Sequence, residues 1–257
     1  MMPRSGVEYA TDNITVYRFC RGNCVYCWAW RVPIFRTRIS KGKYNPIREA
    51  ERYLSYLERR TIVISFTADP YPLEEVPQKL TRRVLEVLSK AKQHRILILT
   101  KNPVTAVTRD LDLMLRHGNM WLGTTITTLS DNVAEVLEPG ATLPSARLAA
   151  LKFAHEKGVK TWISIEPIIP YVTYPEDIVR ETAEYVDWYV LGSLNYWRLL
   201  RIPKICDPMP EDGMFTSRDL AMWYNKHVPE TVKILESLGK DYFIKKELMR
   251  WLDGDQG

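Results

Sequence analysis

Cysteine is scarce in this chain, and the marks of a secreted or membrane protein are missing. Only four cysteines occur among the 257 residues, and three of them fall within eight positions, too close together for a disulfide framework. No apolar run reaches the ~18 residues that cross a bilayer, and the N-terminal residues lack the apolar core of a signal peptide. We therefore expect a soluble, cytoplasmic protein with no membrane partner, whose clustered cysteines bind a metal in a reducing compartment.

The chain also lacks a strong excess of charge of either sign. Lysine and arginine number 36 against 31 aspartates and glutamates, which gives a net charge of +5. Such a mild excess permits a polyanionic partner without requiring one. Apolar residues make up 46% of the chain, enough to bury a full core. The length suits one α/β barrel domain over residues 1–257, with a core at about 14–196 and a C-terminal extension at 197–257.

Two hydrophobic periodicities alternate along the chain. Apolar, β-branched runs predict six strands at Ile14–Phe19, Thr61–Phe66, Arg95–Thr100, Met120–Thr127, Lys160–Ile165 and Trp188–Leu191. Helical spacing predicts helices at Ile47–Leu57, Gln78–Lys92, Val104–Leu115, Ser145–Lys157, Glu176–Tyr185 and Thr216–Leu238. This alternation predicts an α/β fold, a partial (βα)6 barrel of the TIM type followed by a helical C-terminal extension. In such barrels the chemistry lies at the carboxyl ends of the strands.

A loop with three cysteines follows the first predicted strand. Cys20, Cys24 and Cys27 are spaced CxxxCxxC, with Gly22 between the first two. Thiolates are soft ligands that suit iron–sulfur clusters, and three of them in so tight a loop can converge on one cluster. The fourth iron of a 4Fe-4S cluster would then lack a cysteine and stay open to a small bidentate molecule. A zinc site is the alternative, but it normally takes four protein ligands in two pairs, and the second pair is missing here.

Six sequence blocks in the right order extend the match beyond the cysteines. They are NCVYCW, SFTADPYPLEE, ILTKNP, TTITTLSDNVAEVLEPGATLPSARLAAL, ISIEPIIP and LGSLNYW. Over these blocks, from Ile14 to about Tyr196, the chain resembles the spore photoproduct lyase-like branch of the radical S-adenosylmethionine (SAM) superfamily. The resemblance implies a partial barrel that binds a 4Fe-4S cluster and SAM. It also implies reductive cleavage of SAM to a 5′-deoxyadenosyl radical that abstracts hydrogen, with electrons from an external donor of the flavodoxin or ferredoxin type.

The resemblance implies SAM-contacting roles for three residues near the cluster. Tyr26 matches the family's aromatic contact to the adenine end of SAM, although its ring could equally pack over the cluster. Lys101 stands where the family has a lysine for the SAM carboxylate, and its alternative is a charge at the barrel rim. Asp69 stands where the SAM amino group binds, and its alternative is an ordinary Asp-Pro turn.

Four further residues at strand ends match positions near SAM in this family. Thr125 and Thr127 end the fourth strand, and alternation puts both on one face, although threonines are also common strand formers. Ser164 and Glu166 belong to the fifth strand. Glu166 would face the barrel mouth, where its carboxylate could meet the ribose hydroxyls of SAM or an active-site cation, and a surface salt bridge is the alternative.

One departure from the family pattern concerns how the reaction ends. In the spore enzyme a cysteine just ahead of the T-x-D stretch returns a hydrogen atom to the product radical, and Phe66 holds that place here. We therefore do not predict photoproduct repair. Cys206, in the loop IPKICDPMP, could replace that donor if the loop folds over the barrel mouth, although a lone cysteine is more often a small apolar residue.

The substrate stays open. Residues 31–60 combine basic side chains with Phe35, Tyr44, Tyr53 and Tyr56, the elements of phosphate contact and base stacking. The same stretch contains a predicted amphipathic helix whose charged face would serve solvation alone. Nucleic acid is thus one possible partner, and a protein or small molecule is another. A nucleic-acid-binding protein with a purely structural metal site is the competing function.

The C-terminal extension carries its own aromatic and basic side chains. Its aromatics are Trp223, Tyr224, Tyr242, Phe243 and Trp251, beside Lys245, Lys246 and Arg250. An incomplete barrel has an open edge to cover, so we expect these residues to cap it rather than to line a substrate groove.

Overall fold

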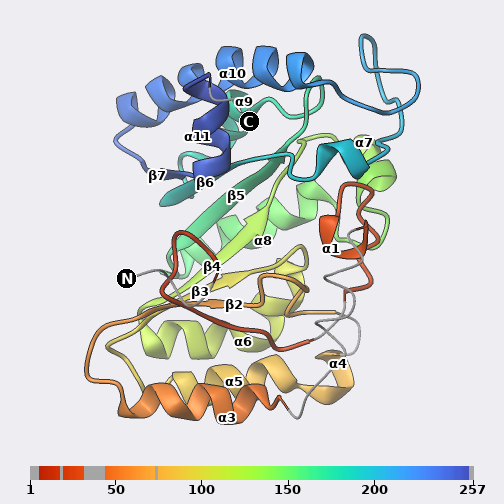
Figure 1. The fold of residues 1–257 in the computed structure, drawn as a ribbon. Coiled ribbons are helices and arrows are strands. Elements are labelled where there is room, and N and C mark those ends of the chain that lie inside the picture. Colours follow the sequence, from red (N-terminus) through yellow and green to blue (C-terminus); the bar gives the residue numbers. More distant parts are fainter. Residues whose placement is uncertain (1–5, 18–19, 32–43, 73–74, 255–257) are drawn as a thin grey trace.

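Seven parallel strands lie side by side in the order in which they occur in the chain (Figure 1). The computed structural model describes residues 6–17, 20–31, 44–72 and 75–254. The strands are β1 (Asp12–Ile14), β2 (Thr61–Ile64), β3 (Arg95–Leu99), β4 (Met120–Thr125), β5 (Thr161–Ile168), β6 (Trp188–Ser193) and β7 (Asp241–Ile244). The sheet curves into an open half-barrel, which confirms the predicted α/β partial barrel.

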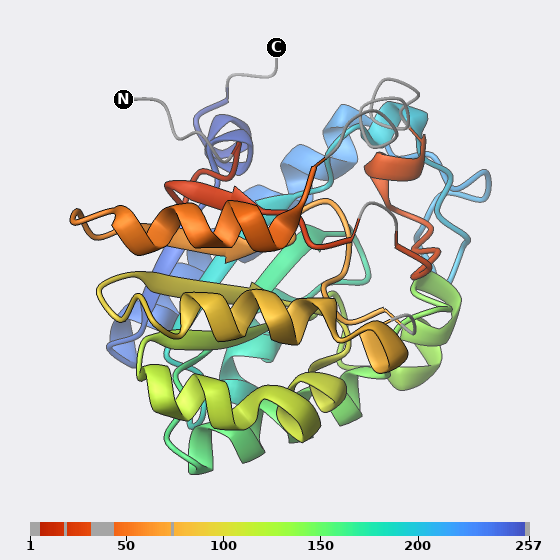
Figure 2. The ribbon, with the colours of Figure 1, turned by 90° about the horizontal axis from the view of Figure 1, so that it is seen from below.

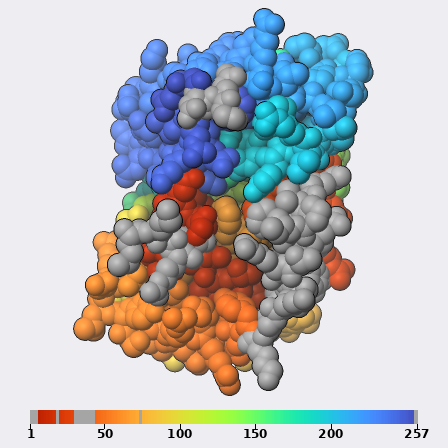
Figure 3. Space-filling view, in the orientation of Figure 1, coloured from red at the N-terminus to blue at the C-terminus, as the bar shows by residue number. Residues whose placement is uncertain are grey.

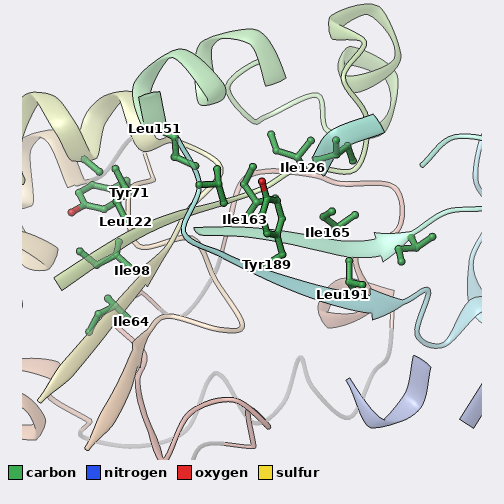
Figure 4. Close-up of a cluster of buried hydrophobic side chains, with 14 of the residues drawn as sticks. Ile64, Tyr71, Ile98, Leu122, Ile126, Leu151, Ile163, Ile165, Tyr189 and Leu191 are labelled. Carbon is green, nitrogen blue, oxygen red and sulfur yellow. The ribbon is translucent and has the colours of Figure 1, made fainter. Parts of the chain in front are cut away.

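The strands are nearly continuous apolar runs because both faces of the sheet are buried. One face packs against the helices, and there Ile64 is paired with Ile98 and Ile98 with Leu122 (Figure 4). The alternate residues form a second cluster, which includes Trp162 of β5 and Val190 of β6. This second cluster fills the inside of the half-barrel with apolar side chains.

Helices follow the strands and cover the outside of the sheet (Figure 2). They are α1 (Trp28–Arg31), α3 (Pro46–Arg52), η1 (Tyr53–Ser55), α4 (Glu75–Gln78), α5 (Leu80–Leu88), α6 (Pro103–His117), α7 (Asp131–Leu137), α8 (Pro144–Glu156), α9 (Pro175–Thr182), η2 (Trp197–Leu199), α10 (Ser217–Ser237) and α11 (Lys246–Leu252). Pro103, Pro144 and Pro175 occupy first turns, and Gly118 ends α6 in a left-handed conformation. None of the helices in the described ranges is long and apolar enough to cross a membrane.

Several segments differ from the sequence prediction. The first strand ends at Ile14 rather than beginning there, because Val16 N donates to Ser65 Oγ instead of continuing the ladder; residues 18–19 lie outside the described ranges. Lys79 adopts a left-handed conformation (φ 52°), so the helix expected at Gln78–Lys92 begins only at Leu80 and ends at Leu88 as α5, and the separate short helix α4 precedes it. Helix α7 was not predicted separately, because its seven residues are too few for a clear periodicity.

The C-terminal extension does more than add a helix. In α10, Trp223 Nε1 donates to Thr173 O at 3.0 Å. Tyr224 OH accepts from Leu194 N, just after β6, and donates to Ile168 O, at the last residue of β5. The chain then adds β7 to the sheet beside β6, which the sequence analysis did not foresee because four residues carry little pattern. In the space-filling view of Figure 3, the N-terminal segment (red) lies between the region of α3 (orange) and the C-terminal extension (blue).

Candidate active site

A cavity of about 460 Å³ opens at the carboxyl ends of the strands. Its size falls in the range of small-molecule sites. Segments that follow β1 to β6 all contribute to its wall. The lining residues include Cys20–Gly22, Cys24, Tyr26–Trp28, Ser65–Asp69, Leu99–Asn102, Thr125, Gly140–Thr142, Ser164, Glu166, Pro167 and Ser193–Asn195. The location agrees with the rule for parallel barrels, in which the functional residues gather at this end.

The three clustered cysteines all line this cavity. Within their loop, Gly22 N donates to Cys20 Sγ at 3.3 Å, and Cys27 N donates to Cys24 O at 3.0 Å. In the described residues no three His, Cys, Asp or Glu side chains are grouped to hold one metal ion. A cluster does not need such a group, because each thiolate binds a separate iron.

Burial changes the acidity of two of these thiols. It raises the pKa of Cys24 to about 12, with the positive charge of Lys101 acting in the opposite direction. Burial, followed by the charge of Asp69, also raises the pKa of Cys20. Both thiols are therefore protonated at neutral pH without a metal, and metal binding must release their protons.

The end of α7 and the loop that follows it hold the cysteine loop from behind. Gly140 N donates to Gly22 O at 3.0 Å, and Val25 N donates to Leu137 O at 2.9 Å. A Cβ atom on Gly140 would lie only 2.3 Å from the backbone oxygen of Arg21. Glycine is therefore required at this position, because any side chain would push the cysteine loop away.

A buried network around Glu138 joins the same loop to the cavity. Tyr26 OH and Arg147 Nη2 donate to its carboxylate, and Thr127 Oγ1 donates to Oε1 at 3.1 Å. Burial alone would raise the pKa of Glu138, but the charges of Lys101 and Arg147 outweigh it and lower that pKa. The carboxylate therefore stays ionised inside the protein, and it fixes the ring of Tyr26 at the cavity wall.

Lys101 lies at the cavity wall, above Tyr26. Its Nζ is 5.6 Å from the centre of the Tyr26 ring, within cation–π range. Burial lowers the pKa of Lys101, but the opposing influence of Cys24 and Glu138 is larger and leaves it raised. A charged ammonium group thus stands beside the cysteines, where the resemblance places a partner for the SAM carboxylate.

Asp69 also lines the cavity, but its carboxylate already accepts three hydrogen bonds. Thr100 Oγ1 and Tyr71 N donate to Oδ1 at 2.6 and 2.8 Å, and Lys101 N donates to Oδ2 at 2.7 Å. Asp69 therefore shapes the turn that carries Lys101. A carboxylate has room for about four donors, so one further donor such as an amino group can still bind.

The predicted hydroxyl residues separate into two groups. Thr125 of β4 and Ser164 of β5 are register partners, and both line the cavity. Thr127, beyond the end of β4, is not among the lining residues and instead donates to Glu138. The structure thus brings Thr125 and Ser164 to the cysteines and places Thr127 behind Tyr26.

Glu166 lines the cavity and forms an ion pair with the C-terminal extension. Lys245 Nζ donates to its Oε1 at 2.6 Å, and the two side chains are only 10% and 15% exposed. The pair is therefore largely buried and is not the surface salt bridge that was the alternative for Glu166.

The sequence analysis considered two residues in connection with the return of a hydrogen atom to the product radical, and the structure places them differently. Phe66, which holds the place of the missing cysteine, lines the cavity. Cys206 is exposed, is not among the lining residues, and donates to Tyr171 O at 3.4 Å. The structure does not bring Cys206 to the other site residues, because its loop packs near Tyr171 rather than over the cavity, so we do not carry the hydrogen-donor hypothesis forward.

The basic and aromatic stretch offers less for stacking than its composition indicated. Residues 32–43, including Phe35, lie outside the described ranges. Tyr53 is buried, with its ring against His94 and Tyr56, and is not available to a base. Arg52 pairs with Glu49 on the exposed side of α3, which is the pattern of an ordinary solvated helix.

Sequence reasoning missed four residues that organise the site. They are Glu138, Gly140, Arg147 and Lys245. The first three belong to a block that carried the family resemblance, so their motif was noticed although their contacts were not. Lys245 was expected only to help cap the barrel, and nothing local marks its contact with Glu166, since that partner lies 79 residues earlier in the chain.

A parallel half-barrel with three thiols and a lysine at its carboxyl mouth defines a cluster-binding α/β enzyme fold. Residues 14–186 match the Radical SAM superfamily, and the chain belongs to that superfamily. Membership implies an iron–sulfur cluster and SAM. The side chains present fit both cofactors, because the soft thiols that suit a cluster and a lysine that suits the SAM carboxylate line one cavity.

Two related sequences belong to uncharacterized proteins, so they indicate no activity. The chain is 29% identical over 192 residues to the uncharacterized protein MJ0683 of Methanocaldococcus jannaschii, covering 74% of this chain and 71% of that protein. It is 34% identical over 128 residues to ORF301 of Acidianus two-tailed virus, covering 49% of this chain and 40% of that protein.

Solved structures share the fold. A spore photoproduct lyase variant with bound AdoMet and dinucleoside spore photoproduct superimposes with a TM-score of 0.66 at 17% identity, covering 94% of this chain and 77% of that one. Streptococcus suis SuiB bound to its precursor peptide SuiA has a TM-score of 0.61 at 13% identity, covering 95% and 51%. At such identities the likeness concerns the fold alone.

Proposed function

We propose that this protein is a radical SAM enzyme that reductively cleaves SAM at a 4Fe-4S cluster held by Cys20, Cys24 and Cys27. The observation that carries the proposal is the gathering of these thiols, Lys101 and two strand-end hydroxyls on one cavity. When bound, the cluster would supply one electron to SAM, which would cleave into methionine and a 5′-deoxyadenosyl radical able to abstract hydrogen from a substrate. The electron comes from an external flavodoxin or ferredoxin.

The residues of the chain bind and orient SAM. Lys101 pairs with the SAM carboxylate, and Asp69 accepts from its amino group through the capacity left beside its three present donors. Thr125 and Ser164 offer hydroxyls from neighbouring strands, and Glu166 offers a carboxylate to the ribose. The apolar cluster beneath them keeps water from the barrel interior.

SAM binding and cleavage test this proposal directly. Anaerobic reconstitution with iron and sulfide should give broad absorbance near about 400 nm, and dithionite with SAM should then release 5′-deoxyadenosine. A colourless protein that retains zinc and does not bind SAM would contradict the proposal and favour a structural metal site.

The role of Lys101 is tested by Lys101→Met in the reconstituted protein. Loss of a charge-assisted hydrogen bond of about 1.5–3 kcal/mol should weaken SAM binding about tenfold or more, measured by equilibrium dialysis. Lys90→Met on the exposed side of the molecule is the matched control. Unchanged SAM affinity with a full cluster would exclude Lys101 as the carboxylate partner.

A further inference from the structure

A buried ion pair links Glu166 of the cavity wall to Lys245, which lies behind it and is not itself among the lining residues. Glu166 comes from β5, whereas Lys245 directly follows β7 in the C-terminal extension. The superfamily match ends at residue 186, so Lys245 lies outside the matched part of the chain. The extension thus sends a charged group to the site.

Three contacts hold Lys245 in place, two of them through its ammonium group. Its backbone N donates to Leu191 O at 3.0 Å, continuing the register of β7 on β6. Its Nζ donates to Glu166 Oε1 at 2.6 Å and lies 5.1 Å from the centre of the Phe66 ring. An ammonium fixed by an ion pair and a cation–π contact has little freedom to move.

Glu166 is confined on its other side by the backbone of β6. A Cβ atom on Gly192 would lie 2.7 Å from Cγ of Glu166, so the carboxylate side chain lies directly against that glycine. Beneath it, Tyr9 fills the barrel with its ring against Trp162 and Phe243, and its buried hydroxyl has no hydrogen-bond partner among the described residues. Lys245 is therefore the cation that compensates the Glu166 carboxylate at this depth.

We propose that Lys245 is a positioning residue that holds the Glu166 carboxylate at the cavity wall, so that the C-terminal extension completes the SAM site. The inference rests on the proposed function, in which Glu166 meets the ribose hydroxyls of SAM. Lys245 engages Oε1, and the carboxylate keeps its second oxygen for a ligand hydroxyl. Without the ammonium, the Glu166 carboxylate would lose the hydrogen-bond donor that holds it, and it would turn towards water and leave that geometry.

The test compares Lys245→Met with Lys245→Arg and with Lys246→Met, a neighbouring lysine that is exposed. SAM affinity is measured by equilibrium dialysis on unreduced, reconstituted protein, together with iron content and apo-protein melting temperature. Lys245→Met should weaken SAM binding about tenfold, the size typical of removing a group that orients a ligand residue. Iron content should stay at the wild-type level, Lys245→Arg should restore most of the affinity, and Lys246→Met should change nothing.

A double variant separates positioning from general packing. Glu166→Gln combined with Lys245→Met should bind SAM no more weakly than Glu166→Gln alone, because Lys245 acts through Glu166. Additive losses, or wild-type affinity in folded and loaded Lys245→Met, would overturn the inference. If Lys245→Met does not fold, Lys245→Gln takes its place. Failure of the wild-type protein to bind SAM would instead refute the proposed function.

Discussion

At the cysteine loop, the residue that leaves the least room for substitution is Gly140. The amide of Gly140 donates to Gly22 O, and its α-carbon faces the backbone of Arg21. Three thiols can bind one cluster only if the loop keeps its shape, and that shape depends on a glycine more than a hundred residues away. A residue without a functional group thus decides the geometry of the proposed cluster ligands.

Gly140→Ala should lower cluster loading without unfolding the protein. The added methyl group would overlap the Arg21 oxygen, and relieving such overpacking costs about 1–3 kcal/mol, which displaces the loop. We expect clearly less iron per protein after reconstitution, measured by iron analysis and absorbance. Gly239→Ala is the control, because its left-handed backbone is strained by a side chain but the new atom meets nothing within 4 Å. Equal iron content in wild type and Gly140→Ala would contradict this role.

At the scale of elements, α7 and α8 act as one support behind the cavity. Glu138, just after α7, pairs with Arg147 of α8, and both side chains are almost fully buried. Arg147 Nη1 also donates to Thr125 O at 2.9 Å, which ties the support to β4. The family resemblance marked this segment, and the structure gives its physical reason as a buried charge network.

Arg147→Met should destabilise the apo-protein by about 3–5 kcal/mol, because it leaves the Glu138 carboxylate buried without its partner. Glu138→Gln combined with Arg147→Met should cost less than Arg147→Met alone, since no charge is then stranded. Urea unfolding gives the free energies. As a matched surface case, Arg180→Met, which removes exposed pairs with Asp177 and Glu230, should cost under about 1 kcal/mol. A larger loss in the double variant than in Arg147→Met would argue against the network.

At the scale of the whole molecule, folding keeps the ring of His117 buried and neutral, whereas unfolding exposes that ring to water. Its Nδ1 accepts from Asn119 N at 3.1 Å, and its Nε2 lies 3.3 Å from Ala91 O, the arrangement of a neutral ring. Burial lowers its pKa below the ordinary value of 6.5. The folded state therefore binds fewer protons than the unfolded state once the pH falls below that value.

The stability contributed by a neutral His117 is complete above pH 6.5 and is lost as the pH falls towards the lower folded pKa. His117→Asn keeps an acceptor for Asn119 N and cannot titrate. We expect its unfolding free energy to fall less steeply between about pH 7 and pH 5 than that of the wild type, by up to about 1.4 kcal/mol per pH unit. His155→Gln, at a partly exposed position, is the control. Parallel pH profiles for wild type and His117→Asn would contradict the assignment.

Most of the barrel could be predicted from the sequence, because parallel strands buried on both faces leave long apolar runs between amphipathic helices. The runs around Ile64, Ile98 and Ile163 mark strands that the structure confirms. Strand β7 could not be predicted in this way, because its four residues form an edge and have a neighbour on one side only. Its existence depends on the exposed edge of β6, which only the folded sheet presents.

The same division holds for the site. Local spacing marked the cysteine loop as the candidate cluster site, because three thiols within eight residues are close enough to bind one cluster, whereas the loop's shape depends on Gly140. Strand-end position determined that Lys101 and Glu166 face the same mouth. Only the tertiary structure decided that Glu138 fixes Tyr26 and that Lys245 pairs with Glu166. Those contacts join segments far apart in the chain, and the sheet register and helix packing that bring them together are properties of the whole fold.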